Sequence, residues 1–323
     1  NVSFIIKLWD IMKPRRYFPK ILVACVLTGM LSGCISNQQP GTDTADVLRV
    51  SVILPHEDDT YWGFVKSGIE DHLSEAKQGG VDVKILIPQL NYNVQQMTDL
   101  IKKEIAAKVD ILVVTGSQDK NYIAALQKAA HECITIVSLD TGFEDGVSES
   151  LYIGSDNYAA GKLMGEKLAG LMGGKGSYSI ISGDTGYNNL EKRIQGLKDV
   201  LAAYPDISLY EIQYDQYDAL SAVADYYTMA NADALVCVEG TGAHAIEKVI
   251  GTGNKKFRYI IGFDVADRIQ EGIINGIVIQ NQYTMGEKLI EQLLYYKEHR
   301  SFESKQIYTD IQWVDAFSEK DNS

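Results

Sequence analysis

Short runs of apolar, mostly β-branched residues recur along the chain from residue 48 onward. They are four to seven residues long, as is typical of buried strands, and occupy 48–54, 81–87, 110–114, 134–139, 177–181, 233–238, 258–263 and 277–280. Between them, apolar residues follow the spacing of one helix face, for example Met97, Ile101 and Ile105. Alternating strands and helices predict an α/β fold whose parallel sheets carry helices on both faces.

Polar residues collect where the predicted strands end. Parallel strands bring their carboxyl ends to one edge of a sheet, and ligand sites in α/β folds lie at that edge. The residues at or directly after these ends include Asp59, Tyr61, Trp62, Asp140, Thr141, Glu239, Asp264 and Gln280. Polar ends on apolar strands therefore predict a cleft that these side chains line.

Composition and charge restrict the class of protein. The chain has 323 residues, of which 46% are hydrophobic and 23% charged. That is enough for two cores of about 130 residues each. The formal net charge is -13 at pH 7. Because such a surface repels a phosphate backbone, we exclude nucleic acid as a partner.

Three alternative chemistries have weaker support than simple binding. Gly240, Gly242 and Ala245 have the outline of a dinucleotide site, but Glu239 directly before them would repel a pyrophosphate. The chain has no G-x-S-x-G elbow, and its five histidines show no triad spacing, which argues against a hydrolase. A metal site at His56 to Asp59 is conceivable, but the run lacks zinc or calcium spacing. The sequence predicts neither catalysis nor a cofactor.

The first 34 residues have the pattern of an export signal. A basic cluster around Arg15 precedes an apolar stretch over 21–31, which is short for a membrane span. Leu31-Ser-Gly-Cys34 resembles the lipobox of bacterial lipoproteins, which implies cleavage before Cys34 and lipidation of its thiol. We expect a signal peptide with its lipobox over 1–34 and a flexible tether over 35–47. Met12 directly precedes the basic cluster, so we expect residues 1–11 to lie before the start of translation. An uncleaved membrane anchor is the alternative.

Two further cysteines, Cys133 and Cys237, lie in or beside apolar strand-like runs. We predict that both are buried thiols. A disulfide between them is arithmetically possible, but two cysteines more than 100 residues apart do not form the framework of a small secreted fold.

Six longer segments resemble, in order, the landmarks of ribose/galactose-type (type I) periplasmic binding proteins. They are VILPHEDDTYWGFVKSGIE, ITIVSLDT, YIGSDNYAAGKLMGEKL, GKGSYSIISGDTGYNNLEKRIQGLKDVL, IIGFD and IVIQNQYTMGEKLIEQL. The fold is shared with the effector domains of lac-repressor-like regulators. The resemblance implies two similar, doubly wound lobes joined by three crossovers, near Gly154, Gln280 and Thr309. The lobes would comprise 48–154 with 281–309, and 155–280 with 310–323.

The resemblance also assigns binding residues. It implies contacts at Asp59, Tyr61, Trp62, Asp140, Asp264 and Gln280, with Tyr61 and Trp62 as stacking aromatics. The chain departs from the family pattern where Thr141 and Glu191 replace arginines and Glu239 replaces an asparagine, which leaves Arg193 as the nearby base. Since five carboxylates would share one cleft with a single arginine, we expect a ligand that brings its own hydrogen-bond donors, such as a cyclitol or an amino sugar.

Tyr61 and Trp62 also have a packing interpretation. Trp62 begins a helical stripe, with Val65 and Ile69, that could belong wholly to the core. Tyr61 lies off this stripe and would face the carboxyl edge of the sheet, where its ring can stack on a sugar. The two interpretations of Trp62 remain open at this point.

The resemblance implies a solute-binding lipoprotein on the extracytoplasmic side of a membrane. It would clamp a small polyhydroxylated ligand and deliver it to an ABC transporter permease. A ligand-sensing lipoprotein that presents its closed form to a membrane sensor kinase needs the same clamp and is the alternative. A cytoplasmic regulator does not fit the export signals. We expect a monomer that is not an enzyme and holds no metal.

Overall fold

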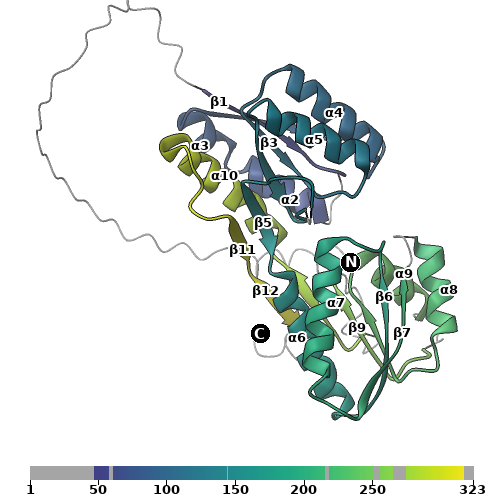
Figure 1. Ribbon diagram of the computed structural model, residues 1–323. Coiled ribbons are helices and arrows are strands. Elements are labelled where there is room, and N and C mark those ends of the chain that lie inside the picture. Colours follow the sequence, from purple (N-terminus) through teal and green to yellow (C-terminus); the bar gives the residue numbers. More distant parts are fainter. Residues whose placement is uncertain are drawn as a thin grey trace, which may run out of the picture. The chain divides into compact units, whose positions relative to one another are not determined.

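Two sheets form the framework of the protein (Figure 1). The structure is a computed structural model and describes residues 47–57, 61–143, 145–214, 218–250, 255–264 and 274–315. Sheet A contains β1 (Leu48–Ile53), β2 (Val81–Leu86), β3 (Ile111–Val114), β4 (Thr135–Leu139), β5 (Leu151–Ser155) and β11 (Gln306–Thr309). Sheet B contains β6 (Gly176–Ser182), β7 (Ile207–Tyr214), β8 (Ala234–Cys237), β9 (Tyr259–Phe263), β10 (Gly276–Gln280) and β12 (Ile311–Val314).

The two sheets have matching strand orders. Sheet A runs β11-β5-β4-β3-β1-β2, and sheet B runs β12-β10-β9-β8-β6-β7. Every neighbouring pair is parallel except β10 with β12, which is antiparallel. Corresponding strands therefore occupy corresponding places, and β4 beside β5 in sheet A matches β9 beside β10 in sheet B.

Helices connect the strands, and several are fixed at their starts by short polar side chains. They are α2 (Tyr61–Glu70), α3 (Leu73–Gln78), α4 (Val94–Ala106), α5 (Lys120–His131), α6 (Asn157–Met172), α7 (Asn188–Leu201), α8 (Ala219–Thr228), α9 (Gly240–Ile250) and α10 (Gln282–His299). Asp119 accepts hydrogen bonds from the amides of Asn121 and Tyr122, and Asp156 accepts one from Ala159. These caps satisfy amides that have no partner inside the helix.

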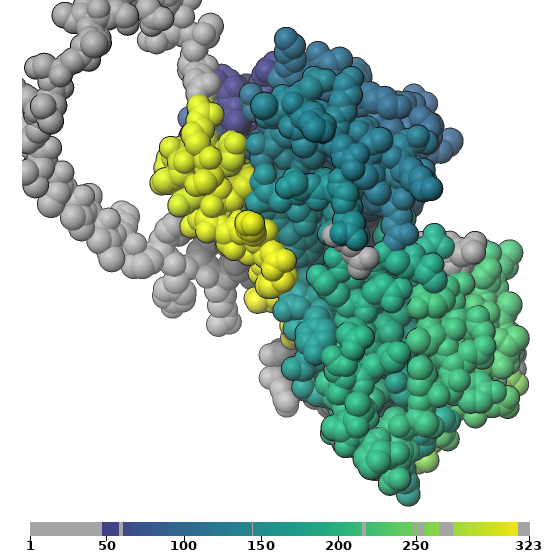
Figure 2. Space-filling model, in the orientation of Figure 1, coloured from purple at the N-terminus to yellow at the C-terminus, as the bar shows by residue number. Residues whose placement is uncertain are grey.

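The chain passes between the sheets three times. It leaves sheet A after β5 and enters α6, which contacts β9 and β10. It leaves sheet B after β10 and enters α10, which contacts α2 and β5. It then runs from β11 in sheet A to β12 in sheet B with Asp310 alone between them. In Figure 2 the C-terminal segment, drawn yellow, accordingly lies against elements from the first part of the chain.

Three apolar clusters among the described residues pack helices against the two sheets. One cluster joins β1 and β3 to α2 and α10 through Val52, Trp62, Val65 and Leu289. A second joins the other face of sheet A to α4 and α5. A third joins sheet B to α6 and α7. Strands that are covered on both faces need apolar side chains at every position, which explains the continuous apolar runs in the sequence of the central strands. No helix among the described residues is long and apolar enough to span a membrane.

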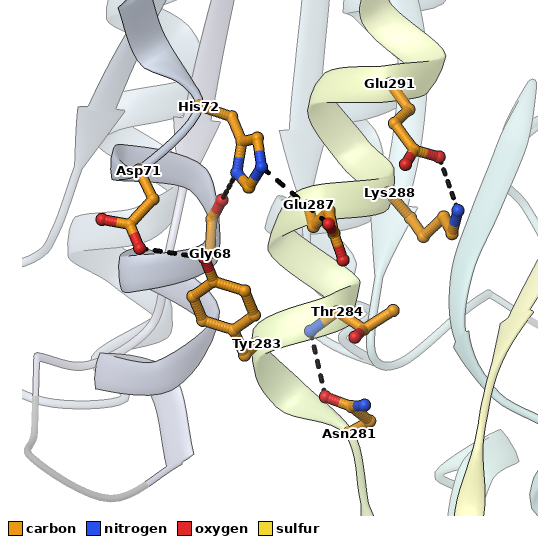
Figure 3. Close-up of polar contacts among 9 residues, drawn as sticks. All are labelled: Gly68, Asp71, His72, Asn281, Tyr283, Thr284, Glu287, Lys288 and Glu291. Carbon is orange, nitrogen blue, oxygen red and sulfur yellow. Dashed lines mark hydrogen bonds and ion pairs between the residues drawn. The ribbon is translucent and has the colours of Figure 1, made fainter. Parts of the chain in front are cut away.

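Two helix pairs approach closely because glycine lies at the crossing. A Cβ atom on Gly68 of α2 would lie 2.0 Å from the carbonyl oxygen of Tyr283 on α10. Figure 3 shows this pair, in which the Tyr283 hydroxyl donates to Asp71 Oδ2 at 2.9 Å and His72 Nε2 lies 3.9 Å from Glu287 Oε1. On α6, a Cβ atom on Gly161 would lie 2.0 Å from the carbonyl oxygen of Arg193 on α7. Both crossings bring backbone against backbone.

The structure confirms the predicted α/β class and all eight predicted strands. Four strands of the described part of the chain were not predicted: β5, β7, β11 and β12. Of these, β7, β11 and β12 are sheet edges with mixed or exposed side chains, so they lack the apolar run of a central strand.

The prediction for Cys133 was wrong, because this thiol is exposed in the turn after α5, where its φ is 61°. Cys237 is buried in β8 as predicted, and no disulfide joins it to Cys133. Cys34 and the predicted signal peptide lie outside the described residues.

Candidate functional site

A hydrogen-bond network links the carboxyl ends of the two sheets. Tyr61, the first residue of α2, donates its hydroxyl hydrogen to Asp140 Oδ1, directly after β4. The same hydroxyl oxygen accepts from Gln280 Nε2, at the end of β10, at 3.2 Å. Thr141 Oγ1 donates to the other carboxylate oxygen of Asp140 at 2.8 Å. Tyr61, Asp140 and Gln280, which sequence analysis placed at strand ends, thus form one connected site.

Asp140 and Asp264 occupy equivalent places in the two sheets and share an unusual backbone conformation. Asp140 follows β4 with φ at 68°, and Asp264 follows β9 with φ at 59°. The amide of Asp140 donates to Ile153 O on β5, and that of Asp264 donates to Val278 O on β10, both at 2.8 Å. Left-handed backbone is uncommon for residues other than glycine, although aspartate tolerates it better than most. Such strain, repeated at two matching strand ends, is typical of functional sites.

The Asp264 carboxylate is held by residues at and just after the end of β10. It accepts from the Gln280 amide at 3.0 Å and from Gln280 Nε2 at 2.7 Å. Gln282 Nε2 adds a third contact at 3.3 Å. Burial raises the pKa of Asp264 to about 6, although Arg193 and the Gln280 hydrogen bonds act in the opposite direction. This carboxyl group is therefore poised to change its charge in weakly acidic solution.

Arg193 supplies the positive charge of the site from inside the protein. Its side chain belongs to α7 and is 3% exposed. Nε donates to Asn157 Oδ1 at 2.8 Å, and Nη1 donates to the Val238 carbonyl at 2.9 Å. The guanidinium carbon lies 3.6 Å from the centre of the Phe263 ring, in a cation–π contact. Three contacts from three elements fix the orientation of the guanidinium, which favours paired hydrogen bonds to a ligand.

Asn157, Val238 and Phe263 were missed by sequence analysis. Asn157 lies 36 positions before Arg193, and no local pattern connects the two. Val238 contributes only its carbonyl group, which every residue carries. Phe263 was assigned to an apolar strand, where a phenylalanine needs no further explanation. The partners of a buried arginine are therefore visible only after the chain has folded.

Glu239 and Glu191 accept hydrogen bonds from backbone amides that are close to them in the sequence. Glu239 is 5% exposed and accepts from the amides of Thr241 and Gly242, each at 2.6 Å, at the start of α9. Burial raises its pKa, while those amides and the charge of Arg193 lower it. Glu191 Oε1 accepts from the Gly186 amide at 3.1 Å. Glu239 therefore stabilises the start of α9, and Glu191 stabilises the turn between β6 and α7, in addition to any contact with a ligand.

The two adjacent aromatics have different surroundings. Trp62 is 4% exposed and belongs to the apolar cluster with Val65 and Ile69, as its helical stripe indicated. Its ring packs edge-on against Tyr61, with centroids 5.3 Å apart and planes at 72°. Tyr61 is half-buried and bonded to Asp140 and Gln280. Asp59 lies outside the described residues.

The site offers fixed donors and acceptors for a polar ligand. Gln280 is 2% exposed, and its Oε1 has no hydrogen-bond partner among the described residues. A buried polar atom in this state is an acceptor for a ligand hydroxyl or amine. No group of three His, Cys, Asp or Glu side chains in the described part of the chain could hold a metal ion. The arrangement is suited to binding through hydrogen bonds.

Known proteins of one family are similar to this chain. The family model for the periplasmic binding protein domain matches residues 50–301. The D-apiose import binding protein of Paraburkholderia graminis is 23% identical over 261 residues, which cover 78% of this chain and 82% of the relative.

Two solved structures have the same fold. The first is an ABC transporter solute-binding protein from Burkholderia graminis C4D1M in complex with D-arabinose, with a TM-score of 0.73 at 26% identity. This match covers 87% of this chain and 98% of the chain in that structure. The second is the XylFII-LytSN complex, with a TM-score of 0.70 at 21% identity. This match covers 84% of this chain and 98% of the chain in that structure. The family model contains Tyr61, Asp140, Arg193, Asp264 and Gln280, and the chain belongs to the family of periplasmic binding proteins.

Proposed function

We propose that this protein binds a small sugar-like ligand between the lobes built on sheets A and B and delivers it to an ABC transporter permease. The observation that carries the proposal is the network of Tyr61, Asp140, Gln280 and Asp264, which joins both sheets beside the fixed guanidinium of Arg193. The D-arabinose complex of a relative and the D-apiose import binding protein support a sugar as the ligand. The lobes would be 48–154 with 281–309, and 155–280 with 310–323.

Each polar residue has a distinct role in this proposal. Asp140 and Asp264 accept hydrogen bonds from ligand hydroxyls, whereas Arg193 donates a pair of hydrogen bonds to ligand oxygens. The Tyr61 ring stacks on the C–H face of the ligand, and Trp62 supports that ring from the core. Each charge-assisted hydrogen bond contributes about 1.5–3 kcal/mol. A few such contacts are sufficient for micromolar affinity, which corresponds to about 8 kcal/mol.

The ligand class follows from the balance of donors and acceptors. Thr141 uses its hydroxyl hydrogen on Asp140, and Glu191 and Glu239 present carboxyl oxygens as acceptors, so Arg193 is the main cationic donor assigned to this site. A ligand rich in hydroxyl groups, or one with an ammonium group, matches this supply. We therefore propose a cyclitol or an amino sugar ahead of a neutral pentose or hexose.

Calorimetry on the purified protein tests the binding function and the ligand class together. The panel is D-ribose, D-glucose, myo-inositol and D-glucosamine. Saturable binding of any member, lost in Arg193→Met, supports the clamp; no binding of any sugar or cyclitol tried contradicts it. If ribose or glucose binds at least as tightly as the inositol and the amino sugar, and Glu191→Arg changes no affinity, the ligand class is wrong while the clamp stands.

The membrane anchor is a separate proposal. Cys34 would carry lipid and hold the protein on the extracytoplasmic side of the membrane through the tether 35–47. Membership of a periplasmic binding protein family supports an exported location. In cells, Cys34→Ala should leave an uncleaved precursor, whereas normal processing and release of the variant would refute lipidation.

A sensing role is the second candidate. The similarity to the XylFII-LytSN complex favours it, since that neighbour of the same fold is seen in a protein complex. Both roles need the same clamp. Deletion of the protein in its host separates them: loss of ligand uptake with an intact transcriptional response supports transport, and the reverse supports sensing.

A further inference from the structure

A polar cavity of about 330 Å³ lies beside the passages of the chain between the sheets. Its walls come from the loop after β4, the strands β5 and β11, and the first turns of α6 and α7. The volume falls in the range of small-ligand pockets. Tyr61, Asp140, Arg193, Glu239, Asp264 and Gln280 do not line it. The cavity is therefore distinct from the site proposed above, and we call it the crossover cavity.

Two residues that line the crossover cavity each have a buried oxygen atom without a hydrogen-bond partner among the described residues. Ser155, at the end of β5, is 1% exposed, and its Oγ has no partner among the described residues. Asn189 Oδ1, in the first turn of α7, is also buried and has no partner in the described part of the chain. A buried polar atom without a partner lowers the stability of the folded protein. A hydrogen-bonding molecule that reaches these oxygens from the cavity would remove this cost.

Charged and aromatic side chains complete the wall. Glu149 precedes β5 of sheet A and Lys192 belongs to α7 beside sheet B, and the charge of Lys192 partly offsets the rise that burial causes in the pKa of Glu149. Tyr152 and Tyr308 add two rings with centroids 6.2 Å apart and planes at 67°. Because both signs of charge are present, no single-sign ligand is favoured. Aromatic faces next to hydroxyl, amide and carboxylate groups match a molecule with several hydroxyl groups on an apolar ring.

We propose that the crossover cavity is a second binding site, which takes a small neutral polyhydroxylated molecule such as a monosaccharide or a cyclitol. Hydroxyl groups are suited to it because Asn189 Oδ1 can only accept a hydrogen bond, Lys192 Nζ can only donate one, and Ser155 Oγ can do either. One class of ligand group meets all three requirements. This site is additional to the clamp and does not depend on the clamp being correct.

Hydrogen bonds connect the crossover cavity to the clamp. The Tyr152 hydroxyl lies 2.9 Å from the Asp140 carbonyl and 3.0 Å from the Ser155 carbonyl, and it donates to these oxygens. Asn157 lines the cavity, donates through Nδ2 to the Tyr152 oxygen at 3.3 Å, and accepts from Arg193 through Oδ1. A molecule in the cavity therefore touches the residues that orient Asp140 and Arg193. Occupancy of one site should change the affinity of the other, and the effect is reciprocal.

Calorimetry with D-glucose, D-ribose and myo-inositol on the purified protein tests the proposal. We expect two bound molecules per chain for at least one probe. Asn189→Leu and Ser155→Val each remove an unpartnered oxygen and should weaken the second binding event at least tenfold. Gln195→Leu is the matched control for Asn189→Leu, because Gln195 is an exposed residue of the same helix and does not line the cavity. Its side chain donates a hydrogen bond to Asp199. This control should retain both binding events.

Arg193→Met separates the two sites. It should remove binding at the clamp and leave the cavity event, so failure of the clamp and failure of the second site give different results. Two results overturn the proposal: no probe gives a binding event that survives in Arg193→Met, or the surviving event is left unchanged by Asn189→Leu. If Ser155→Val does not fold, Asn189→Leu decides, since Asn189 lies in the first turn of a helix. Tyr152→Phe should make the two events independent if the Tyr152 hydroxyl carries the coupling.

Discussion

Adding one methyl group to Gly161 should damage both stability and ligand binding. Gly161 lies in α6 where this helix crosses α7. A Cβ atom there would lie 2.0 Å from the carbonyl oxygen, 2.7 Å from the carbonyl carbon and 2.8 Å from the Cα of Arg193. These are backbone atoms, so no side-chain rotation relieves the overlap. The helices must separate by about 1.4 Å before the shortest contact reaches an ordinary 3.4 Å.

The expected magnitude follows from two opposing effects. Overpacking of this kind costs about 1–3 kcal/mol, and we expect the upper end because backbone must move. Replacing glycine by alanine inside a helix returns about 0.5–1 kcal/mol. Gly161→Ala should therefore destabilise the protein by about 1–2.5 kcal/mol. Since the clash is with Arg193 itself, the separation also moves its guanidinium relative to Asp264 and should weaken binding at the clamp.

Gly170→Ala is the matched control. Gly170 lies in the same helix, and no atom lies within 4 Å of a Cβ added there. This change should stabilise the protein by about 0.5–1 kcal/mol through helix propensity alone. The two variants carry the same substitution in one helix and should move in opposite directions.

Urea unfolding followed by circular dichroism measures the difference. The free energy of unfolding falls by about 1–3 kcal/mol per molar urea for small proteins and more steeply for larger ones. The two variants should therefore have clearly separated unfolding midpoints, with Gly161→Ala below the unmodified protein and Gly170→Ala above it. If Gly161→Ala unfolds at or above the midpoint of Gly170→Ala, the close crossing of α6 and α7 is not as described.

Three further predictions concern the clamp. Because burial raises the pKa of Asp264 to about 6, above about 3.9 in an unfolded chain, the folded state binds more protons between these values. The contribution of this group to the free energy of unfolding should then fall as pH rises from about 4 to about 6. Over that range, Asp264→Asn should gain stability relative to the unmodified protein. A stability difference that does not change with pH would contradict the burial of the carboxyl group. Tyr61→Phe removes the hydroxyl that bonds Asp140 and Gln280, so it should lower the free energy of unfolding by about 1–3 kcal/mol, and an unchanged urea midpoint would argue against the network. Small-angle scattering should give a smaller radius of gyration with saturating ligand than without it, as hinge closure requires; an unchanged radius would count against clamping.

Much of the framework was predictable from the order of residues alone. Apolar runs and helical spacing are local properties, so they revealed eight of the strands and the alternation that makes a parallel α/β fold. The positions of Tyr61, Asp140, Asp264 and Gln280 at strand ends were also visible. The carboxyl ends of parallel strands share an edge, so these residues could be grouped from their places in the sequence. The stripe of Trp62, Val65 and Ile69 likewise indicated core packing, which the burial of Trp62 shows.

Other features arose only from contacts between distant parts of the chain. The edge strands β7, β11 and β12 have no apolar run, because a strand with one neighbour leaves part of its surface in water. Cys133 lies beside an apolar run, yet its turn leaves the thiol exposed. The left-handed backbone of Asp140 and Asp264, the partners of Arg193, and the crossover cavity each depend on elements that are far apart in the sequence. Local pattern determines which elements form and which faces are apolar, whereas hydrogen-bond partners and cavities depend on how those faces meet in three dimensions.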